Sequence, residues 1–308
     1  MAKTAFIFPG QGSQYVGMGK ALYDEYSVAR EYFERADEAL GRPLSQICFE
    51  GPEEKLKETK NTQPGIFTVS AIVDAILKEK GIEPSVTAGH SLGEYAALYC
   101  AGCLSFEDAL KLVVERGNAM NVASEATDGT MAAVMGLDLE DVRKACQESD
   151  GIVKIANINA PGQVVITGEN AAVRLASEKA KEAGAKRAIQ LPVHGAFHSP
   201  LMDTAARRLA GELANVEIKE PKIDFINNAD AEFLTDPDKI RGSLARQVTS
   251  CVRWVESMQK VIGKGVEAMV EAGPGKVLFG LGRRIDKSVP VYPCDTPESI
   301  EKTIGKLK

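Results

Sequence analysis

The sequence predicts an α/β fold with a larger domain, built on a mostly parallel β-sheet covered by helices, and an inserted ferredoxin-like small domain. Short β-branched or aromatic runs alternate with longer helical stretches along most of the 308 residues, which is typical of a parallel sheet with helical connections. Between about 126 and 193 the order changes to βαββαβ, the order of a ferredoxin-like unit. The length allows one large α/β body and a modest second domain.

Three strand-like runs mark the large domain, near 4–8, 85–90 and 266–271. Each run is followed by a turn that contains glycine. In open α/β sheets, ligands bind at the carboxyl ends of the strands. We therefore expect the functional site to lie where these runs end.

The insert has its own series of predicted elements: a strand at 130–136, a helix at 139–149, a strand pair at 153–159 and 164–168, a helix at 170–183 and a final strand. The strand pair reverses direction at Ala160-Pro161-Gly162, because proline and glycine suit a tight turn.

Two short segments are expected to join the insert to the rest of the chain, a hinge at 125–129 and a return near 191–195. They divide the chain into a large α/β domain, residues 1–125 and 196–308, and a small domain, residues 126–195.

Composition excludes several classes of function. The formal net charge of -6, with no basic run longer than two residues, argues against binding of nucleic acid. No apolar run approaches the roughly 18 to 20 residues that span a bilayer, so we expect a cytoplasmic protein, and we expect it to be a monomer. The six cysteines are scattered, and Cys100-x-x-Cys103 lacks the partner ligands of a zinc site, so we expect reduced core thiols and no metal.

The motif Gly89-His90-Ser91-Leu92-Gly93 follows a strand-like run and precedes a helix-forming one. This G-x-S-x-G pattern is typical of a sharp strand-to-helix turn, where the small residues allow close backbone packing and the serine Oγ projects at the helix N-terminus. We predict Ser91 as a nucleophile rather than a helix cap, with the amide of Leu92 facing an oxyanion. His90 points elsewhere at such a turn, so we expect a structural role for it.

The chain has only three histidines, so with His90 set aside a histidine base is either His194 or His198, and the residues alone do not choose between them. A second oxyanion donor is available in the loop Pro9–Gln14, because its glycines allow close approach of the backbone to a ligand. This loop lacks the third glycine of a dinucleotide motif, so phosphate binding is not predicted.

Arg116 lies on a predicted amphipathic helix over 105–123, which opens with a capping pattern of Ser105 and Asp108. Two interpretations remain open from its position. It forms a surface ion pair, or it lies in a cleft and holds a carboxylate through two parallel hydrogen bonds, which lysine does not reproduce.

Taken together, the motifs resemble those of the malonyl-CoA:acyl carrier protein transacylase family over nearly the whole chain. The matching stretches, in order, are Phe8–Gln14 (FPGQGSQ), Gly89–Glu94 (GHSLGE), Arg116, Asn159–Ile166 (NAPGQVVI), Gly195–Ser199 (GAFHS), Gln247 with Trp254, and Gly273–Gly275 (GPG).

The resemblance implies an α/β-hydrolase-like large domain and an acyltransferase of fatty-acid or polyketide synthesis. Ser91 would attack malonyl-CoA, carry the malonyl group as an ester, and yield it to the phosphopantetheine thiol of acyl carrier protein. His198 would be the base, oriented by a backbone carbonyl near Gln247 rather than by an aspartate. The amides of Gln11 and Leu92 would form the oxyanion hole.

The resemblance also implies how the acyl group is selected. Arg116 would clamp the malonyl carboxylate. Phe197, just before the base, would disfavour an α-methyl group by about 1–3 kcal/mol. Asn159 is a candidate for the wall of the cleft, with a role in the hairpin as the alternative. No cofactor is implied, since the phosphopantetheine belongs to the partner.

The chain departs from the family pattern at His194, where a serine is common, and at Cys251, where a proline is common. Neither change removes a catalytic group, but His194 introduces a second imidazole near the predicted base. Two other functions remain as alternatives: a serine thioesterase or hydrolase, which shares the nucleophile turn, and a non-catalytic module that binds acyl carrier protein.

Overall fold

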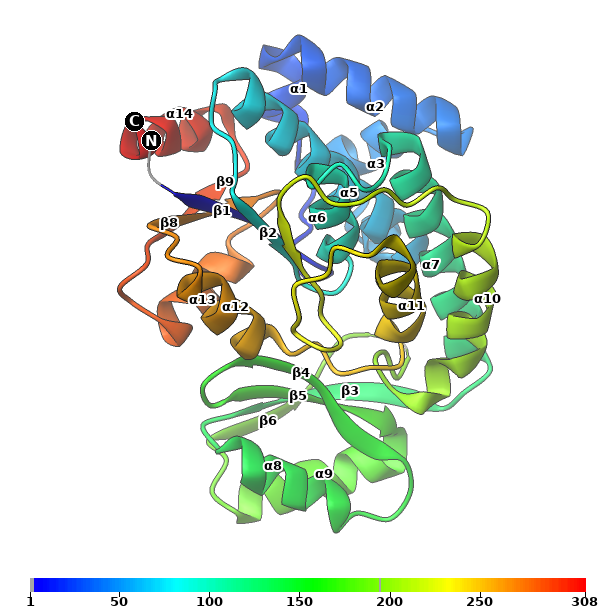
Figure 1. The fold of residues 1–308 in the computed structure, drawn as a ribbon. Helices are drawn as coiled ribbons and strands as arrows, with labels where there is room; N and C mark the ends of the chain where they lie inside the picture. The colour runs from blue at the N-terminus through cyan, green and yellow to red at the C-terminus, as the bar shows by residue number, and fades with distance from the viewer. Residues whose placement is uncertain (1–2, 194) are drawn as a thin grey trace.

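The computed structural model describes residues 3–193 and 195–308, so His194 lies outside the described residues. A five-stranded sheet forms the centre of the larger part, and a four-stranded sheet with two helices forms the smaller part at its lower edge in Figure 1. The mixed α/β class predicted from the sequence is confirmed.

The central sheet is parallel throughout its described pairs, in the order β7-β2-β1-β8-β9. Its strands are β1 (Thr4–Phe8), β2 (Val86–Gly89), β7 (Asp224–Ile226), β8 (Ala268–Ala272) and β9 (Val291–Cys294). Because all strands run the same way, the turns after β1, β2, β7 and β8 meet at one edge of the sheet.

Side chains of β1 alternate between the two faces of the sheet. Phe6 and Phe8 join the main hydrophobic cluster. Ala5 and Ile7 join a second cluster on the opposite face. This strand is buried on both faces, as expected for a central strand of a parallel sheet.

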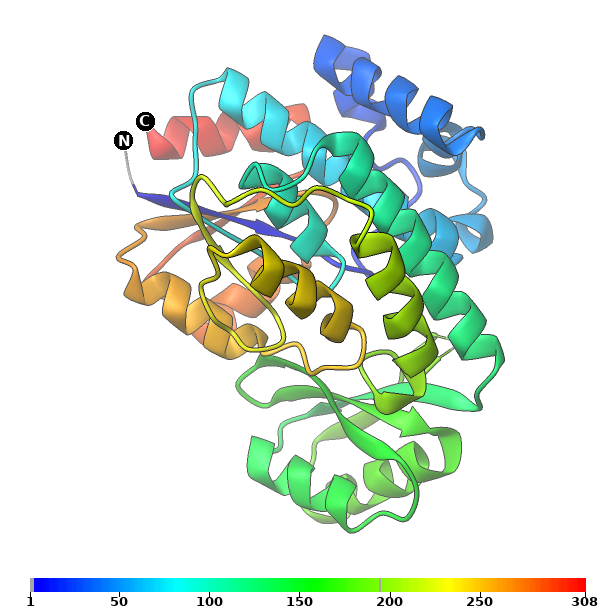
Figure 2. The same cartoon turned by 45° about the vertical axis from the view of Figure 1, so that its right-hand side comes forward.

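Helices cover both faces of the central sheet (Figures 1 and 2). The main cluster lies beneath α5 (Thr59–Glu79), α6 (Gly93–Cys100) and α7 (Phe106–Glu125), and the second cluster lies beneath α12 (Trp254–Gly263) and α13 (Val277–Ile285). Figure 2 shows α7 beside α10 (Asp203–Leu213). The remaining elements are α1 (Lys20–Glu25), α2 (Ser27–Leu40), α3 (Leu44–Glu50), α4 (Glu53–Lys57), the 3-10 turn η1 (Pro200–Met202), α11 (Pro237–Gln247) and α14 (Pro297–Leu307).

The second sheet is antiparallel in the order β4-β5-β3-β6, which is the ferredoxin-like strand order. Its elements are β3 (Gly129–Met135), α8 (Leu139–Gln147), β4 (Val153–Ala160), β5 (Gln163–Glu169), α9 (Asn170–Glu182) and β6 (Arg187–Gln190). Pro161 and Gly162 form the predicted reversal between β4 and β5, and Gly162 has a φ of 68° there.

The small sheet packs against the large domain through alternate side chains. Ala156 and Val165 belong to the main hydrophobic cluster, while Ile155 and Ile166 face the separate cluster under α8 and α9. The segment after α11 adds a backbone junction, because Val252 donates to Ala156 O (2.8 Å) and accepts from Ile158 N (3.0 Å). The domain boundaries after residues 125 and 195 stay a prediction.

Two further features follow from burial. All six cysteines are free thiols; five are buried and Cys251 is half-buried. The burial of Cys100 and Cys103 agrees with the core role expected for them. Within residues 3–193 and 195–308, no helix has both the length and the apolar character that a bilayer crossing requires.

The turn from β2 to α6 presses closely on its neighbours. A Cβ on Gly93 would lie 2.1 Å from Phe8 O, and one on Gly89 would lie 1.9 Å from Gly93 O. These glycines are therefore needed because backbone atoms, which do not move easily, occupy the space of a side chain.

We expect Gly93→Ala to lower the free energy of unfolding by about 1–3 kcal/mol, because the added methyl forces β1 and α6 apart. Gly211→Ala is the matched control: Gly211 is exposed in α10 with no atom within 4 Å of a built Cβ, so alanine should stabilise the helix by about 1 kcal/mol. Urea denaturation of both variants measures the two effects. Equal stabilities would contradict the close packing of this turn.

Candidate active site

Ser91 occupies the tip of the turn between β2 and α6. Its φ is 51°, a left-handed conformation that is unusual for a residue with a side chain. Backbone bonds brace the turn, since His90 N donates to Phe8 O (2.9 Å) and Gly93 N donates to His90 O (2.9 Å). The half-buried Ser91 is thereby held at the carboxyl edge of the sheet, where the sequence placed it.

His198, rather than a neighbour of Ser91 in the chain, contacts the serine oxygen. The distance from His198 Nε2 to Ser91 Oγ is 2.8 Å. His198 Nδ1 lies 3.0 Å from both Gln247 O and Ser250 O. Carbonyl oxygens only accept hydrogen bonds, so Nδ1 carries the proton and Nε2 is free to accept the Ser91 hydroxyl.

The environment keeps the His198 ring neutral. The side chain is 3% exposed. Burial, together with the nearby charge of Arg116, lowers the pKa of His198 from 6.5 to about 3, and the hydrogen bonds to carbonyls only partly oppose this. At neutral pH the ring is therefore an unprotonated base beside a hydroxyl.

Arg116 extends from α7 to the serine. Its terminal NH2 group donates to Ser91 Oγ (3.0 Å) and to Gln247 Oε1 (3.0 Å). The residue is 1% exposed, and its buried Nε has no hydrogen-bond partner among the described residues. Burial lowers the pKa of the guanidinium. A buried cation that is bonded only to neutral groups, with donors to spare, is well suited to receive an anion.

Gln247 connects the arginine to the serine turn. Its Nε2 donates to Ser91 O (2.8 Å) and to Glu94 Oε2 (2.7 Å), while its Oε1 accepts from Arg116. The side chain is fully buried. Because its backbone carbonyl also accepts from His198, one residue fixes the base and the arginine relative to the serine.

Asn228 and Glu94 complete the hydrogen bonds beneath the serine. Asn228 Oδ1 accepts from Ser91 N (2.6 Å), and Asn228 Nδ2 donates to Gly89 O (2.6 Å). Asn228 N in turn donates to Glu94 Oε2 (3.3 Å). Burial raises the pKa of Glu94 to about 7.

The loop after β1 lies directly against the serine turn, since a Cβ on Gly10 would be 2.4 Å from His90 O. This loop carries Gln11. In the described part of the chain, the backbone amides of Gln11 and Leu92 donate to no protein acceptor, whereas Ser91 N is occupied by Asn228. Both predicted oxyanion donors are therefore available, and their role remains a prediction.

The other predicted residues lie beside this centre. Asn159 Oδ1 is 2.8 Å from His90 Nε2, and the His90 ring also meets Trp254 edge to face. These contacts give His90 a structural place. Asn159 reaches the neighbour of the serine rather than Ser91 itself, and Phe197 is buried in the main hydrophobic cluster. Their predicted contacts with substrate stay predictions.

Asn228 and Ser250 are not predicted from the sequence, and Glu94 enters there only as the last residue of the serine motif. A signal for Asn228 was present, because Asn227 and Asn228 directly follow β7 at the edge where the site was expected. Ser250 acts through its backbone carbonyl, so its side chain gives no signal.

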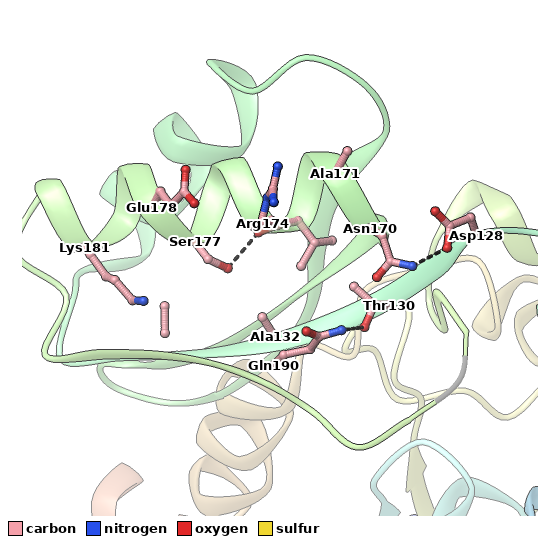
Figure 3. Close-up of a pocket in the computed structure, with 12 residues that line it drawn as sticks. Asp128, Thr130, Ala132, Asn170, Ala171, Arg174, Ser177, Glu178, Lys181 and Gln190 are labelled. Carbon is pink, nitrogen blue, oxygen red and sulfur yellow. Dashed lines mark hydrogen bonds between the residues drawn. The ribbon is translucent and has the colours of Figure 1, made fainter.

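A hollow on the small domain is separate from this centre. It has a volume of about 480 Å³ and lies between α9 and the strands β3 and β6 (Figure 3). Gln190 Nε2 donates to Thr130 Oγ1 (3.0 Å) at its floor, and Asn170 bonds Asp128 at one end. Neither Ser91 nor His198 lines it. The surroundings of Ser91 differ from this hollow, because there the Arg116 guanidinium contacts Oγ.

Comparisons with known proteins agree with this geometry. The acyl transferase domain family matches residues 5–300. The malonyl CoA-acyl carrier protein transacylase of Bacillus subtilis is 47% identical over 100% of this chain and 98% of its own, and that of Escherichia coli K12 is 43% identical over 97% and 98%. Both relatives are aligned over almost their whole length.

Solved structures with the same fold include proteins that are named as transacylases. The transacylase structure from Coxiella burnetii has a TM-score of 0.97 at 39% identity and covers 99% of this chain and 98% of its own. A malonyl-transacylase in complex with its type II PKS acyl-carrier protein also has a TM-score of 0.97 at 39% identity, covering 99% and 100%. The resemblance inferred from the motifs is confirmed.

We expect the His198 ring to remain unprotonated from about pH 5 to pH 8, because burial and Arg116 lower its pKa to about 3. The imidazole proton resonances, assigned by their loss in His198→Ala, should show no protonation step in this range. Histidine in an unfolded peptide serves as the control, with a pKa of about 6.5. A midpoint near that value for His198 would contradict the buried, neutral base.

Proposed function

We propose that this protein transfers a malonyl group from malonyl-CoA to acyl carrier protein through an ester on Ser91. The chain belongs to the malonyl CoA-acyl carrier protein transacylases, within the acyl transferase domain family. The observation that carries this mechanism is the convergence of three groups: a hydroxyl, a neutral imidazole 2.8 Å away, and a buried guanidinium 3.0 Å away. A nucleophile, a base and an anion receptor thus meet at one oxygen.

In the first half-reaction, His198 Nε2 takes the Ser91 proton while Oγ attacks the thioester carbonyl of malonyl-CoA. The carbonyl oxygen becomes negative and is held by the amides of Gln11 and Leu92. Collapse of the tetrahedral intermediate breaks the carbon–sulfur bond, and the imidazolium returns its proton to the CoA sulfur. Malonyl remains on Ser91.

In the second half-reaction, the phosphopantetheine thiol of acyl carrier protein occupies the place that CoA left. His198 removes the thiol proton, and the sulfur attacks the malonyl ester. The same two amides receive the negative oxygen, and Ser91 regains a proton from His198 when its bond to the acyl carbon breaks. All protons are accounted for by one histidine.

Arg116 selects the acyl group in this proposal. Its guanidinium would leave Ser91 Oγ and form two parallel bonds with the malonyl carboxylate, which a neutral acyl group does not offer. Phe197 would restrict the space beside the α-carbon, and Asn159 would support the wall of the cleft through His90.

The chemistry requires no metal or cofactor of its own, because the nucleophile, base and oxyanion donors are all protein groups. Malonyl-CoA and the carrier protein are the proposed partners. We also propose that the protein acts as a cytoplasmic monomer.

The hydrolase alternative shares Ser91, His198 and the oxyanion donors, but it has no evident use for a buried arginine. The orientation of the base also differs, because His198 Nδ1 faces two backbone carbonyls instead of a carboxylate. The binding-module alternative leaves the contact between Ser91 and His198 without a purpose. Transfer is therefore the function that the geometry supports best.

We expect malonyl-CoA to add one malonyl group to the wild-type protein, visible as a covalent adduct in intact-mass spectra. Ser91→Ala should form none. On addition of phosphopantetheinylated acyl carrier protein, radiolabelled malonyl should move mainly to the carrier rather than appear as free malonate. Mainly malonate would favour the hydrolase, and a folded wild-type protein that forms no adduct would favour the binding module.

Arg116→Ala should lower the acylation rate with malonyl-CoA more than the rate with acetyl-CoA, because only malonyl has a carboxylate to lose. We expect the ratio of the two rates to fall by at least about tenfold, the size of a lost charged hydrogen bond. Arg116→Lys keeps the charge but not the two parallel donors, so it should recover only part of the ratio. An unchanged ratio in Arg116→Ala would assign carboxylate recognition to another residue.

A further inference from the structure

We propose that Asn228 is a positioning residue of this acyl transfer: its side-chain amide clamps the backbone of the serine turn and holds Ser91 in the conformation that presents Oγ to His198. The inference rests on the proposed function but concerns a residue outside the motifs of the sequence. Asn228 touches no reacting atom, so it acts only through the position of Ser91.

The clamp is made by both ends of one amide. Oδ1 accepts from Ser91 N (2.6 Å), and Nδ2 donates to Gly89 O (2.6 Å). Asn228 is 1% exposed, so neither bond competes with bulk water. Among side chains in their usual protonation states, the amides of asparagine and glutamine place an acceptor and a donor on one planar group, and the shorter side chain fits this distance.

The position of Asn228 follows from the sheet. Strands β2 and β7 pair in parallel, with Ala88 opposite Ile226. Two residues later the chain of β2 turns away into the serine turn, and backbone pairing with β7 stops. Asn228 lies at this point, so its side chain supplies the hydrogen bonds that the strand no longer provides.

The conformation of Ser91 explains why such a clamp is needed. Its positive φ is strained for a residue with a Cβ, and such conformations persist only where the surroundings fix them. If the turn relaxed, Oγ would move from its 2.8 Å contact with His198 Nε2. Small displacements of a nucleophile cause large losses of rate.

Asn228 is also connected to the base. Its backbone N donates to Glu94 Oε2, which accepts from Gln247 Nε2, and the Gln247 carbonyl accepts from His198 Nδ1. The clamp on the serine and the support of the histidine are therefore parts of one buried set of hydrogen bonds.

Asn228→Asp tests the clamp without a change of shape. The new carboxyl keeps an acceptor for Ser91 N, but its second oxygen donates to Gly89 O only when it is protonated. Burial beside a carbonyl favours the protonated form, so the active form should prevail at low pH and disappear as pH rises. We expect the single-turnover malonylation rate, relative to wild type at the same pH, to fall at least about tenfold between pH 5 and pH 9.

Other titrating groups lie close to Asn228: Glu94 on α6 accepts from its backbone N, Arg253 before α12 donates its backbone N to the Asn228 carbonyl, and Asp230 in the same loop bonds Asn227. They are present in the wild type too, so the ratio of variant to wild type largely removes their contribution. Asn228→Ala provides a further reference, because it lacks both bonds and should be slow at every pH, by about 100-fold.

Asn227→Ala is the matched control for a purely structural effect. Asn227 is equally buried and its side chain bonds Glu232 N (2.8 Å) and Ser243 Oγ (2.6 Å), but no atom of the serine turn. We expect it to lower the melting temperature and to leave the malonylation rate within about twofold of wild type, as expected away from the reacting groups. Equal rates for Asn227→Ala and Asn228→Ala, or an Asn228→Asp ratio independent of pH, would overturn the inference.

A second readout separates this inference from the proposed function. A small fluorophosphonate labels an activated serine without needing malonyl recognition. Slower labelling of folded Asn228→Ala than of wild type would support the clamp even if the wild type formed no malonyl adduct. Equal labelling rates would reject the clamp even if malonyl transfer were established.

Discussion

The site depends on one constraint, a serine held at positive φ between a buried strand and a helix. The turn leaves no room for side chains at Gly89 and Gly93, and its backbone groups other than the Leu92 amide are bonded by residues such as Phe8, Asn228 and Gln247. Oγ is thereby fixed in space before any substrate arrives. A preorganised nucleophile does not lose rotational freedom during the reaction, which lowers the barrier.

Burial sets the charges around this oxygen. It keeps His198 neutral and leaves Arg116 as a cation bonded to uncharged partners. Carbonyl oxygens orient the imidazole without the full negative charge of an aspartate, so they stabilise its protonated form less. Arg116 supplies a positive charge beside Ser91 Oγ, and in the proposed function a malonyl carboxylate would compensate it when bound.

The small domain is joined to the catalytic residues through the segment after α11. Ser250 O accepts from His198, and two residues later Val252 pairs with β4 of the small sheet. The same strand carries Asn159, which bonds the residue before the nucleophile. Both sides of the serine and histidine pair are therefore in contact with β4, so the insert forms part of the support of the site.

The sequence by itself determined the α/β class, the ferredoxin-like insert and the nucleophile turn, because periodicity, glycine positions and a local motif act over short stretches of chain. It left His194 and His198 as equal candidates for the base until the family resemblance was considered. The tertiary structure showed that His198 reaches Ser91 and that the Gln247 carbonyl orients it, and it alone revealed the contacts of Ser250 and Asn228. These contacts join residues 49 to 139 positions apart, and only the folded sheet brings such distant segments to one edge.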